Sequence, residues 1–409
     1  MIKGESFICL ALNTWDSDHM NTLVQIMGPM SKYNKVLYVD YQFTIKDLVV
    51  AMYGNKGIPV RKIAGWDDRL SVVKTKYGSE VYVLNVPPVL PVNWLKNYSI
   101  HDQMLRVNAE IVRRSVVKAS ERLGINDPIV VSGYNPFYGL ATAGSFNEKL
   151  NVYYCYDEIK GDQRYKYHGT RIEEQYLSKA DLVVTTSDAL YQSKASCCKS
   201  CYVIKNGVDF ELFHKASGGV NHGSERKVVA YTGSIDERFH TEVMVHAIEH
   251  MPDVDFTFVG RITNFSAAAA MSRYPNVNIL GSRAPEEVPT FLKKADVGVI
   301  PYLKNEVTSG VYPLKINEYL AAGKPVVMTK FAELNEFEGL VSFVESKEEF
   351  LRALKFELES DNNEKQAQRI DTARKNSWEH RVEEFSTVLI ETLTEKEKLT
   401  TREGNLLSR

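Results

Sequence analysis

The sequence lacks long apolar runs, a strong charge of one sign and a complete set of metal-binding cysteines. No stretch approaches the ~18 uncharged apolar residues that a membrane-spanning helix needs. The chain has 50 lysine and arginine residues against 52 aspartate and glutamate residues, so its net charge of −2 creates no field that would attract nucleic acid. The first apolar run follows Glu5 and ends at Asn13, which is typical of a first strand and not of an export signal, so we expect a cytoplasmic protein.

The five cysteines do not form a recognisable metal site. Cys9 and Cys155 lie in apolar runs and are expected to be buried thiols. Cys197, Cys198 and Cys201 contain a Cys-x-x-Cys pair, but a zinc site needs four ligands and the sequence has no second pair. A redox pair is the alternative. We expect reduced thiols at a helix end, no bound metal and no bound cofactor.

Short apolar runs alternate with longer amphipathic stretches along the whole chain, which predicts an α/β protein with parallel sheets and helical crossovers. A long helix is expected over 102–123, with apolar residues from Leu105 to Val116 on one face and Gly124 as its stop. Strands are expected at 7–12, 36–41, 81–86, 129–132, 152–156, 182–186 and 202–204, and then at 228–232, 256–259, 277–280, 297–301, 326–328 and 341–344.

A polar, glycine-rich segment, HKASGGVNHGSERK, separates the two series of strands and is the best linker in the sequence. We therefore predict an N-terminal domain over 1–212, a linker over 213–226 and a C-terminal domain over 227–375. The last stretch, 376–409, has apolar residues at helical spacing. Ligands of open α/β domains bind at the carboxyl ends of the strands, so the loops there should contain the functional residues.

The stretch VTSGVYPLKINEYLAAGKPVV, residues 307–327, has the features of an anion-binding helix start. Pro313 can occupy the first helical position, and Gly323 can end a short helix in the left-handed conformation. The amides of 309–311 and the helix dipole would attract an anion, and Lys315 would add a full positive charge. Glu318 lies on the same face and could accept two hydrogen bonds from a cis-diol. An anion site beside an acceptor for a cis-diol is what binding of a nucleoside diphosphate requires. The alternative is a surface Lys–Glu pair that contributes almost nothing to stability.

The same stretch resembles the donor-site signature of GT-B glycosyltransferases, in particular the family-4-like glycosyl transferases group 1 and its teichuronic-acid and polysaccharide-biosynthesis branch. Pro313 to Val327 matches the family's Pro-Leu-Lys-x-x-Glu-Tyr-Leu-Ala-Ala-Gly-Lys-Pro-Val-Val element almost throughout. The resemblance is weakest over 42–80 and 90–128. Further matching segments are NGVD at 206–209 with Phe213, SKADLVVTTSDAL at 178–190, YTGSIDERFH at 231–240, FVGR at 258–261, NVNILGSRAPEEVPTFLKKADVGVIPY at 276–302, VYVLNVPPVLP at 81–91 and NSWEHRV at 376–382.

The resemblance implies two Rossmann-like, doubly wound domains that face a central cleft, with a C-terminal helix crossing back to the first domain. It also implies that Glu318 binds the donor ribose and Lys315 the diphosphate, and that no metal is needed because fixed cations and helix dipoles neutralise the leaving group. The full set of implied donor-binding residues is Gly233, Ser234, Arg238, Arg261, Ser282, Arg283, Ser309, Gly310, Val311, Lys315 and Glu318.

The chain departs from the family pattern at three places. Many members have a second glutamate where this chain has Gly310, so recognition of the donor sugar must differ. The family's Arg-x-x-x-x-Lys pair is replaced by Ser234 and Phe239, with Arg238 one position away. The family's His-Asp at the end of a first-domain strand appears as Tyr156-Asp157.

Two residues are candidates for the base that deprotonates the acceptor. Asp157 follows an apolar strand, although a carboxylate that caps local N–H groups is the alternative. His168 is the second candidate, but its basic, tyrosine-rich surroundings, RYKYHGTR, could instead contact acceptor or solvent. The resemblance places the acceptor mainly on the first domain, where Asn13, Thr14 and Asp16 follow the first strand.

We therefore expect an enzyme that transfers a sugar from a nucleotide-diphosphate sugar, with UDP as its nucleotide, to a saccharide or lipid-linked acceptor in bacterial cell-surface polysaccharide synthesis. A GT-B sugar-nucleotide epimerase and a non-catalytic sugar-nucleotide-binding protein are the rivals. A peripheral contact with the inner face of the membrane is a further expectation, with an ordinary solvated face as its alternative. It rests on Val49, Val50, Met52, Tyr53 and Trp66 among the basic residues Lys46, Lys56, Arg61, Lys62, Arg69, Lys74 and Lys76.

Overall fold

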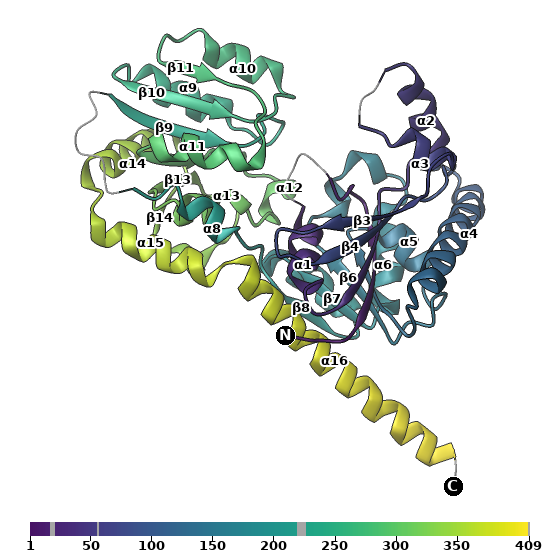
Figure 1. The fold of residues 1–409 in the computed structure, drawn as a ribbon. Helices are drawn as coiled ribbons and strands as arrows, with labels where there is room; N and C mark the ends of the chain where they lie inside the picture. Colours follow the sequence, from purple (N-terminus) through teal and green to yellow (C-terminus); the bar gives the residue numbers. More distant parts are fainter. Residues whose placement is uncertain (17–20, 55–56, 219–225, 408–409) are drawn as a thin grey trace. The chain divides into compact units, whose positions relative to one another are not determined.

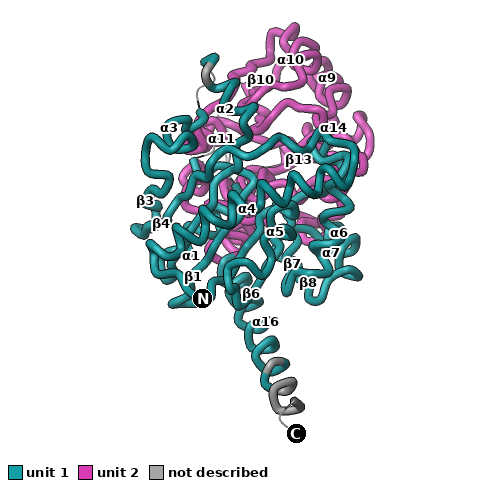
Figure 2. Tube along the Cα trace, turned by 90° about the vertical axis from the view of Figure 1, so that its right-hand side faces the viewer, with its two compact units in different colours: residues 1–205, 382–409 teal, residues 206–381 magenta. Residues whose placement is uncertain are grey.

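The computed structural model describes residues 1–16, 21–54, 57–218 and 226–407. The chain forms two compact units (Figure 2). Unit 1 contains residues 1–205 together with 382–409, and unit 2 contains residues 206–381. Within the described ranges, no helix is both long and apolar enough to span a membrane.

Unit 1 is built on an eight-stranded sheet in the order β3-β4-β2-β1-β5-β6-β7-β8. Its strands are parallel except for β3, which pairs antiparallel with β4 at one edge. The strands are β1 (Ser6–Ala11), β2 (Lys35–Val39), β3 (Leu70–Lys74), β4 (Glu80–Leu84), β5 (Ile129–Gly133), β6 (Leu150–Cys155), β7 (Leu182–Thr185) and β8 (Cys201–Val203).

The interior strands of unit 1 are buried on both faces, as parallel strands between helices must be. The predicted helix over 102–123 is confirmed as α4 (Tyr98–Leu123), which ends at Gly124 with a left-handed φ of +61°. Its residues from Leu105 to Val116 pack into the core. The other helices of unit 1 are α1 (Thr22–Met30), α2 (Ile45–Met52), α3 (Val60–Ala64), α5 (Pro136–Ala141), α6 (Gly169–Lys179) and α7 (Asp188–Lys194) (Figure 1).

Unit 2 is built on a six-stranded parallel sheet in the order β11-β10-β9-β12-β13-β14. The strands are β9 (Lys227–Thr232), β10 (Val254–Val259), β11 (Val277–Ile279), β12 (Val297–Ile300), β13 (Val326–Thr329) and β14 (Val341–Val344). Every strand predicted for this half of the sequence is present.

The helices of unit 2 form two groups. α9 contacts α10 and α14, whereas α13 contacts α8 and α15, which is the arrangement of helices that cover both faces of a sheet. The helices are α8 (Phe210–His214), α9 (Thr241–Glu249), α10 (Phe265–Ser272), α11 (Val288–Lys294), α12 (Glu306–Ser309), α13 (Leu314–Ala321), α14 (Lys347–Ser360) and α15 (Asn363–Lys375) (Figure 1).

The boundary between the units lies at 205/206, before the predicted boundary at 212. The side-chain Nδ2 of Asn206 donates to the backbone carbonyl of Tyr312 at 3.2 Å, and the Phe210 ring lies 4.4 Å from the Arg374 guanidinium. The segment that the sequence places at the end of the first domain therefore packs within unit 2. Most of the predicted linker, 219–225, lies outside the described residues.

The C-terminal helix α16 (Trp378–Leu407) begins in unit 2 and belongs to unit 1 from Val382 onward. The Phe385 ring packs edge-on against Tyr154 of β6, with 5.5 Å between ring centroids. Further along the helix, the Lys396 ammonium contacts the Asp181 carboxylate at 2.6 Å. Phe385 and Lys396 of α16 therefore both contact unit 1.

Candidate functional site

The strand order of unit 2 reverses between β9 and β12, because β10 and β11 lie on one side of β9 while β12, β13 and β14 lie on the other. Such a reversal is where open α/β sheets bind ligands, at the carboxyl ends of the strands. The loops that follow β9, β10 and β12 at this edge contain most of the predicted donor-binding residues.

Two glycines bring the loops after β9 and β10 into direct backbone contact. The Gly233 amide donates to the carbonyl of Val259 at 2.7 Å. Gly260 has a φ of +150°, and a Cβ atom there would lie 2.1 Å from the Gly233 carbonyl oxygen. A Cβ atom at Gly233 would lie 1.9 Å from Cε of Lys315. The absence of a side chain at Gly260 therefore lets the two loops touch, and its absence at Gly233 leaves the space that the Lys315 side chain fills.

Lys315 projects from the first turn of α13 toward the end of β9. Its ammonium donates to the Tyr302 hydroxyl at 3.1 Å and lies 5.7 Å from the ring centroids of Tyr231 and Tyr302. Burial alone would raise the pKa of Tyr302, but the charges of Lys315 and Arg238 outweigh burial and lower that pKa. Within the described part of the chain, no carboxylate pairs with Lys315, so its charge is available to an anion.

The position of α13 is fixed by the residue after Glu318. The buried Tyr319 hydroxyl accepts a hydrogen bond from the Thr232 amide at 2.9 Å, which ties the helix to the end of β9. Gly298 of β12 provides the space for this ring, because a Cβ atom there would lie 2.5 Å from the Tyr319 ring. Gly323, with a φ of +71°, follows the end of the helix in the left-handed conformation that the sequence predicts.

Glu318 lies one turn along α13 from Lys315 and is half-buried. Burial raises the pKa of its carboxyl to about 7, while the charge of Lys315 acts in the opposite direction. No group in the described ranges donates a hydrogen bond to this carboxylate. Its acceptor capacity is therefore open to a ligand.

The predicted anion site at 309–311 needs a correction. The segment contains a helical turn, α12, which Asn305 caps by accepting from the amides of Val307 and Thr308, both at 3.0 Å. The amide of Ser309 donates to the Asn305 carbonyl at 3.0 Å. The amides of Gly310 and Val311 both donate to the Thr308 carbonyl. All three amides are used inside the turn, so none of them is free to bind an anion.

The amides of Leu314 and Lys315 are the available donors instead. Pro313 is the N-cap of α13 and has no side chain that could accept a hydrogen bond from them. Neither amide has an acceptor among the residues that the structure describes. An anion at this helix start would therefore meet two free N–H groups, the positive end of the helix dipole and the Lys315 ammonium.

The remaining residues that are predicted to bind the donor lie at the same edge of the sheet, but their contacts and exposure differ. Arg238 packs its guanidinium on Tyr302, 5.3 Å from the ring centroid, and pairs with Asp236 at 2.6 Å. Its charge is therefore largely balanced. Arg261 is exposed after β10, and its guanidinium has no acceptor in the described ranges. The others are Ser234, half-buried with its carbonyl accepting from the Tyr231 hydroxyl, and Ser282 and Arg283, exposed after β11.

Unit 1 has its own strand-order reversal, between β1 and β5. Asn13, Thr14 and Asp16 follow β1 at this edge; Asn13 and Asp16 are exposed and Thr14 is half-buried. The side-chain Nδ2 of Asn13 donates to the Tyr156 hydroxyl at 3.3 Å. Asn13 thus lies beside the end of β6, where Asp157 follows.

Sequence reasoning missed a buried polar group at the same edge. Asp40 follows β2 and is 6% exposed. Burial raises its pKa to about 6, although its carboxylate accepts hydrogen bonds from the Trp15 amide at 2.7 Å and from Asn85 at 2.9 Å. The sequence contains a pattern that could have identified Asp40, because it follows a buried strand just as Asp157 does.

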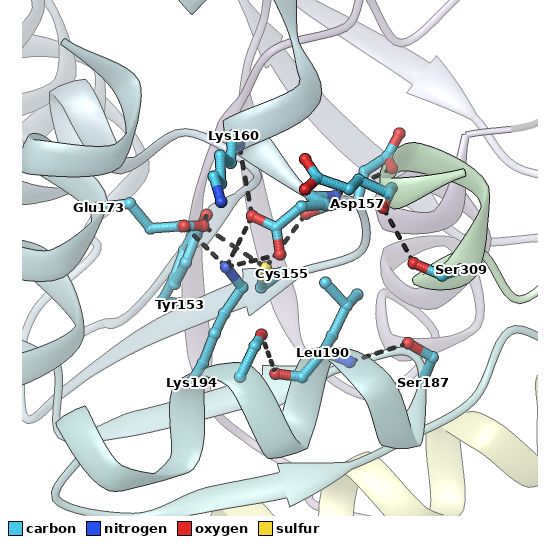
Figure 3. A network of polar contacts seen from close by, with 12 residues as sticks. Tyr153, Cys155, Asp157, Lys160, Glu173, Ser187, Leu190, Lys194 and Ser309 are labelled. Carbon is cyan, nitrogen blue, oxygen red and sulfur yellow. Dashed lines mark hydrogen bonds and ion pairs between the residues drawn. The ribbon is translucent and has the colours of Figure 1, made fainter. Parts of the chain in front are cut away.

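The loop with Asp157 rests on a buried ionic cluster (Figure 3). Asp157 is half-buried, and its carboxylate accepts from the amide of Glu158 at 3.0 Å. The Lys194 ammonium, on α7, contacts Glu158 at 3.3 Å and Glu173 at 2.8 Å, and the Tyr153 hydroxyl donates to Glu173 at 2.6 Å. Because a buried charge without its partner is costly, this cluster fixes the loop.

His168 does not have the exposure that a base needs. It is 2% exposed, and its Nε2 lies 2.6 Å from the Leu95 carbonyl, so Nε2 carries the proton and donates. Its ring stacks on His101 with 3.7 Å between centroids. The prediction of a catalytic His168 is therefore not supported, because the side chain is part of the core that holds residue 95 and the start of α6.

The cysteines are all reduced thiols, with Cys9 and Cys155 buried as predicted. Among the residues with described positions, no group of three or more His, Cys, Asp or Glu side chains is arranged to hold a metal ion.

Parts of this chain are similar in sequence to known proteins. Residues 226–359, within unit 2, match the family model described as "Glycosyl transferases group 1". A Bacillus subtilis (strain 168) protein, TuaH, whose name describes a glycosyltransferase of teichuronic acid biosynthesis, is 30% identical over 176 residues. That match covers 41% of this chain and 44% of TuaH, less than half the length of the relative.

Several solved structures share the fold over nearly the whole chain. The α,α-trehalose 6-phosphate synthase of Burkholderia multivorans has a TM-score of 0.67 at 10% identity, covering 98% of this chain and 100% of its own. Anabaena HepE, solved with UDP and glucose, has a TM-score of 0.62 at 13% identity, covering 95% of this chain and 100% of its own. The chain thus has the GT-B fold, with two Rossmann-like domains.

The close approach of Gly233, Gly260 and Lys315 predicts different outcomes for two similar substitutions. Gly260→Ala would place a Cβ atom against backbone, so we expect it to lower the free energy of unfolding by roughly 1–3 kcal/mol or more. Gly233→Ala would chiefly displace the flexible end of Lys315, with a lesser contact to the Tyr231 hydroxyl, so the protein should stay folded while pyrophosphate binds more weakly. Thermal melts and calorimetric titration with pyrophosphate measure both effects.

Gly339→Ala is the matched control, because Gly339 also has a positive φ, of +79°, but a Cβ atom added there would meet no atom within 4 Å. If Gly260→Ala melts at the same temperature as Gly339→Ala, the backbone contact between the two loops is not the constraint described above.

Proposed function

We propose that the protein is a glycosyltransferase that uses a nucleotide-diphosphate sugar, with UDP as its nucleotide. The observation that carries this proposal is the Lys315 ammonium, which no carboxylate of the described residues pairs, beside the free amides of Leu314 and Lys315 at the strand-order reversal of unit 2. The glycosyl transferases group 1 match over the same unit and the GT-B fold support it.

The diphosphate would lie against the start of α13. Its oxygens would accept hydrogen bonds from the two free amides and from Lys315, while Gly233 allows the approach because a side chain there would occupy the same space. These groups stabilise the negative charge that develops as the bond between the sugar and the diphosphate breaks. Because the fixed charge is in place before the reaction, the proposed mechanism uses no metal and no cofactor.

The ribose would lie one turn along the helix, where the Glu318 carboxylate has open acceptor sites. Hydrogen bonds from two vicinal hydroxyls to one carboxylate are of the stronger, charge-assisted kind. The nucleobase would lie toward Ser282 and Arg283. Arg261 would provide a second contact to the phosphates or the sugar. Gly310 offers no carboxylate to the donor sugar, so the sugar must be recognised by other groups.

Asp157 is our candidate for the base that takes the proton from the acceptor hydroxyl. Its half-buried carboxylate lies on a loop that the Lys194 cluster holds in place. Asn13, Thr14 and Asp16 are the neighbouring acceptor contacts. An inverting reaction requires such a base, and loss of activity in Asp157→Asn with unchanged nucleotide affinity would be consistent with it.

The acceptor is proposed to be a saccharide or lipid-linked saccharide of the bacterial cell surface, at the cytoplasmic side of the membrane. The similarity to TuaH supports this role. The structure adds an exposed apolar surface on and after α2, with Val49 48%, Val50 45%, Tyr53 89% and Trp66 72% exposed. With the nearby Lys46 and Lys62, such a surface suits peripheral contact with anionic lipid. Lys56 lies outside the described residues.

Substitution of the two helix residues tests the proposal. Lys315→Ala should lower kcat/KM by about 10²-fold or more, because a transition-state contact is lost. Glu318→Ala should lower kcat/KM roughly 10- to 100-fold through the loss of charge-assisted hydrogen bonds. Both variants should melt close to the wild type. The assay follows UDP release from a UDP-sugar in the presence of an acceptor extract.

Lys355→Ala and Glu359→Ala on α14 are the matched controls, because both side chains are exposed near the end of that helix. Near-normal rates for the Lys315 and Glu318 variants would overturn the donor site. Conversion of the UDP-sugar without any acceptor would indicate the epimerase, and binding without turnover would indicate the non-catalytic protein.

The raised pKa of Glu318 predicts pH-dependent donor binding. Its carboxyl titrates near pH 7 in the free protein, and only the ionised form accepts two hydrogen bonds from the ribose. Affinity for UDP-glucose should therefore rise about tenfold from pH 6 to pH 8. UDP-glucose is the suitable probe because neither of its phosphates titrates in this range. Calorimetry on Glu318→Gln should give a lower affinity that no longer changes with pH, and an unchanged slope in that variant would contradict the role of Glu318.

A further inference from the structure

Unit 1 contains a pocket that none of the predicted site residues lines. Its volume is about 260 Å³. Leu12, Gln42 and Asn135, at the ends of β1, β2 and β5, place it at the strand-order reversal of this sheet.

The wall of this unit 1 pocket is held rigidly. The Asn108 side chain accepts from the Leu90 amide at 2.8 Å and donates to the Leu90 carbonyl at 2.9 Å, which fixes the 89–92 segment to α4. The Asn135 amide donates to the Gln42 side chain at 3.1 Å, which joins the ends of β5 and β2. These side-chain amides are therefore committed to the protein, and the pocket is formed before any ligand arrives.

The polar groups left for a ligand are phenol hydroxyls. Among the residues that the structure describes, the hydroxyls of Tyr41 and Tyr165 have no hydrogen-bond partner. Both residues lie near Tyr138, whose pKa is raised by burial and further by these two neighbours. Burial also raises the pKa of Tyr165 to about 12, so these phenols are neutral and can each donate or accept.

The charge of the pocket limits its ligand. Among the described residues, Lys46 is the one charged residue of the lining, with an exposed side chain, and no carboxylate lines the pocket. Most of the remaining surface is apolar, from Leu12, Leu90, Leu105 and Phe137. A ligand with several charges would lose its hydration without partners, and a purely apolar chain would cover the hydroxyls of Tyr41 and Tyr165 without pairing them.

We propose that the unit 1 pocket binds one uncharged sugar ring of the acceptor. Such a ring has C–H faces for the apolar walls and hydroxyls for the phenols of Tyr41 and Tyr165. The volume lies just under the ~300–1,000 Å³ typical of small-molecule pockets, which suits one ring and not an oligosaccharide chain. This proposal rests on the proposed function, because it assigns the pocket to the acceptor of that reaction.

The test removes single hydroxyls and keeps the rings. Tyr41→Phe and Tyr165→Phe should each raise the acceptor KM about three- to tenfold, with little change in kcat, because one hydrogen bond is lost. Tyr191→Phe, on the exposed face of α7, is the matched control and should have no effect. The Kd for UDP-glucose should stay unchanged in all three variants, since the donor residues lie in unit 2.

Direct binding identifies the ligand class without a known acceptor. Saturation-transfer NMR with methyl glycosides of glucose, galactose, mannose, N-acetylglucosamine and glucuronic acid should detect at least one neutral sugar and not the uronate. The signal should fall in the Tyr41→Phe/Tyr165→Phe double variant. Binding of the uronate alone, binding of no neutral glycoside, or binding that the double variant does not weaken would overturn the pocket assignment. Failure of the wild type to bind UDP-glucose would instead overturn the proposed function, so the two failures are distinguishable.

Discussion

The close contact of Gly233, Gly260 and Lys315 is the constraint on which the candidate donor site depends. Two missing side chains let the loops after β9 and β10 touch and leave room for one lysine above them. That lysine has aromatic neighbours and no carboxylate partner in the described ranges, so its charge is directed to a ligand. The proposed anion site at the start of α13 follows from this contact together with the Asn305-capped turn, which uses the amides of 309–311 itself.

In unit 1, the loops that follow the strands are held in place by a different kind of contact. Buried polar groups, Asp40 and the Lys194 cluster among them, fix the loops that follow its strands, since each buried charge must keep its partners. The pocket walls are held in the same way by Asn108 and Asn135. Loops that are already ordered before a ligand arrives require less ordering on binding.

Much of this could be predicted from the sequence, because parallel strands buried on both faces are continuous apolar runs that end in polar loops. The strand β3 was missed since it is an edge strand with half-exposed residues, and its pattern is weak. The sequence predicts the anion-binding amides at 309–311 and not at the start of α13, because a local motif does not show that Asn305 caps the turn α12. His168 and the unit 1 pocket depend on contacts between distant segments, such as the contact between His168 and Leu95, which spacing along one chain does not reveal.

We propose that unit 2 recognises the diphosphate and not merely the nucleoside. The most direct measurement is the calorimetric affinity of the wild type for UDP compared with UMP at one pH and ionic strength. UDP should bind about tenfold or more tightly than UMP, a gain of roughly 1.4 kcal/mol or more, because its second phosphate would reach Lys315 and the amides of α13. Equal affinities for UDP and UMP would contradict it.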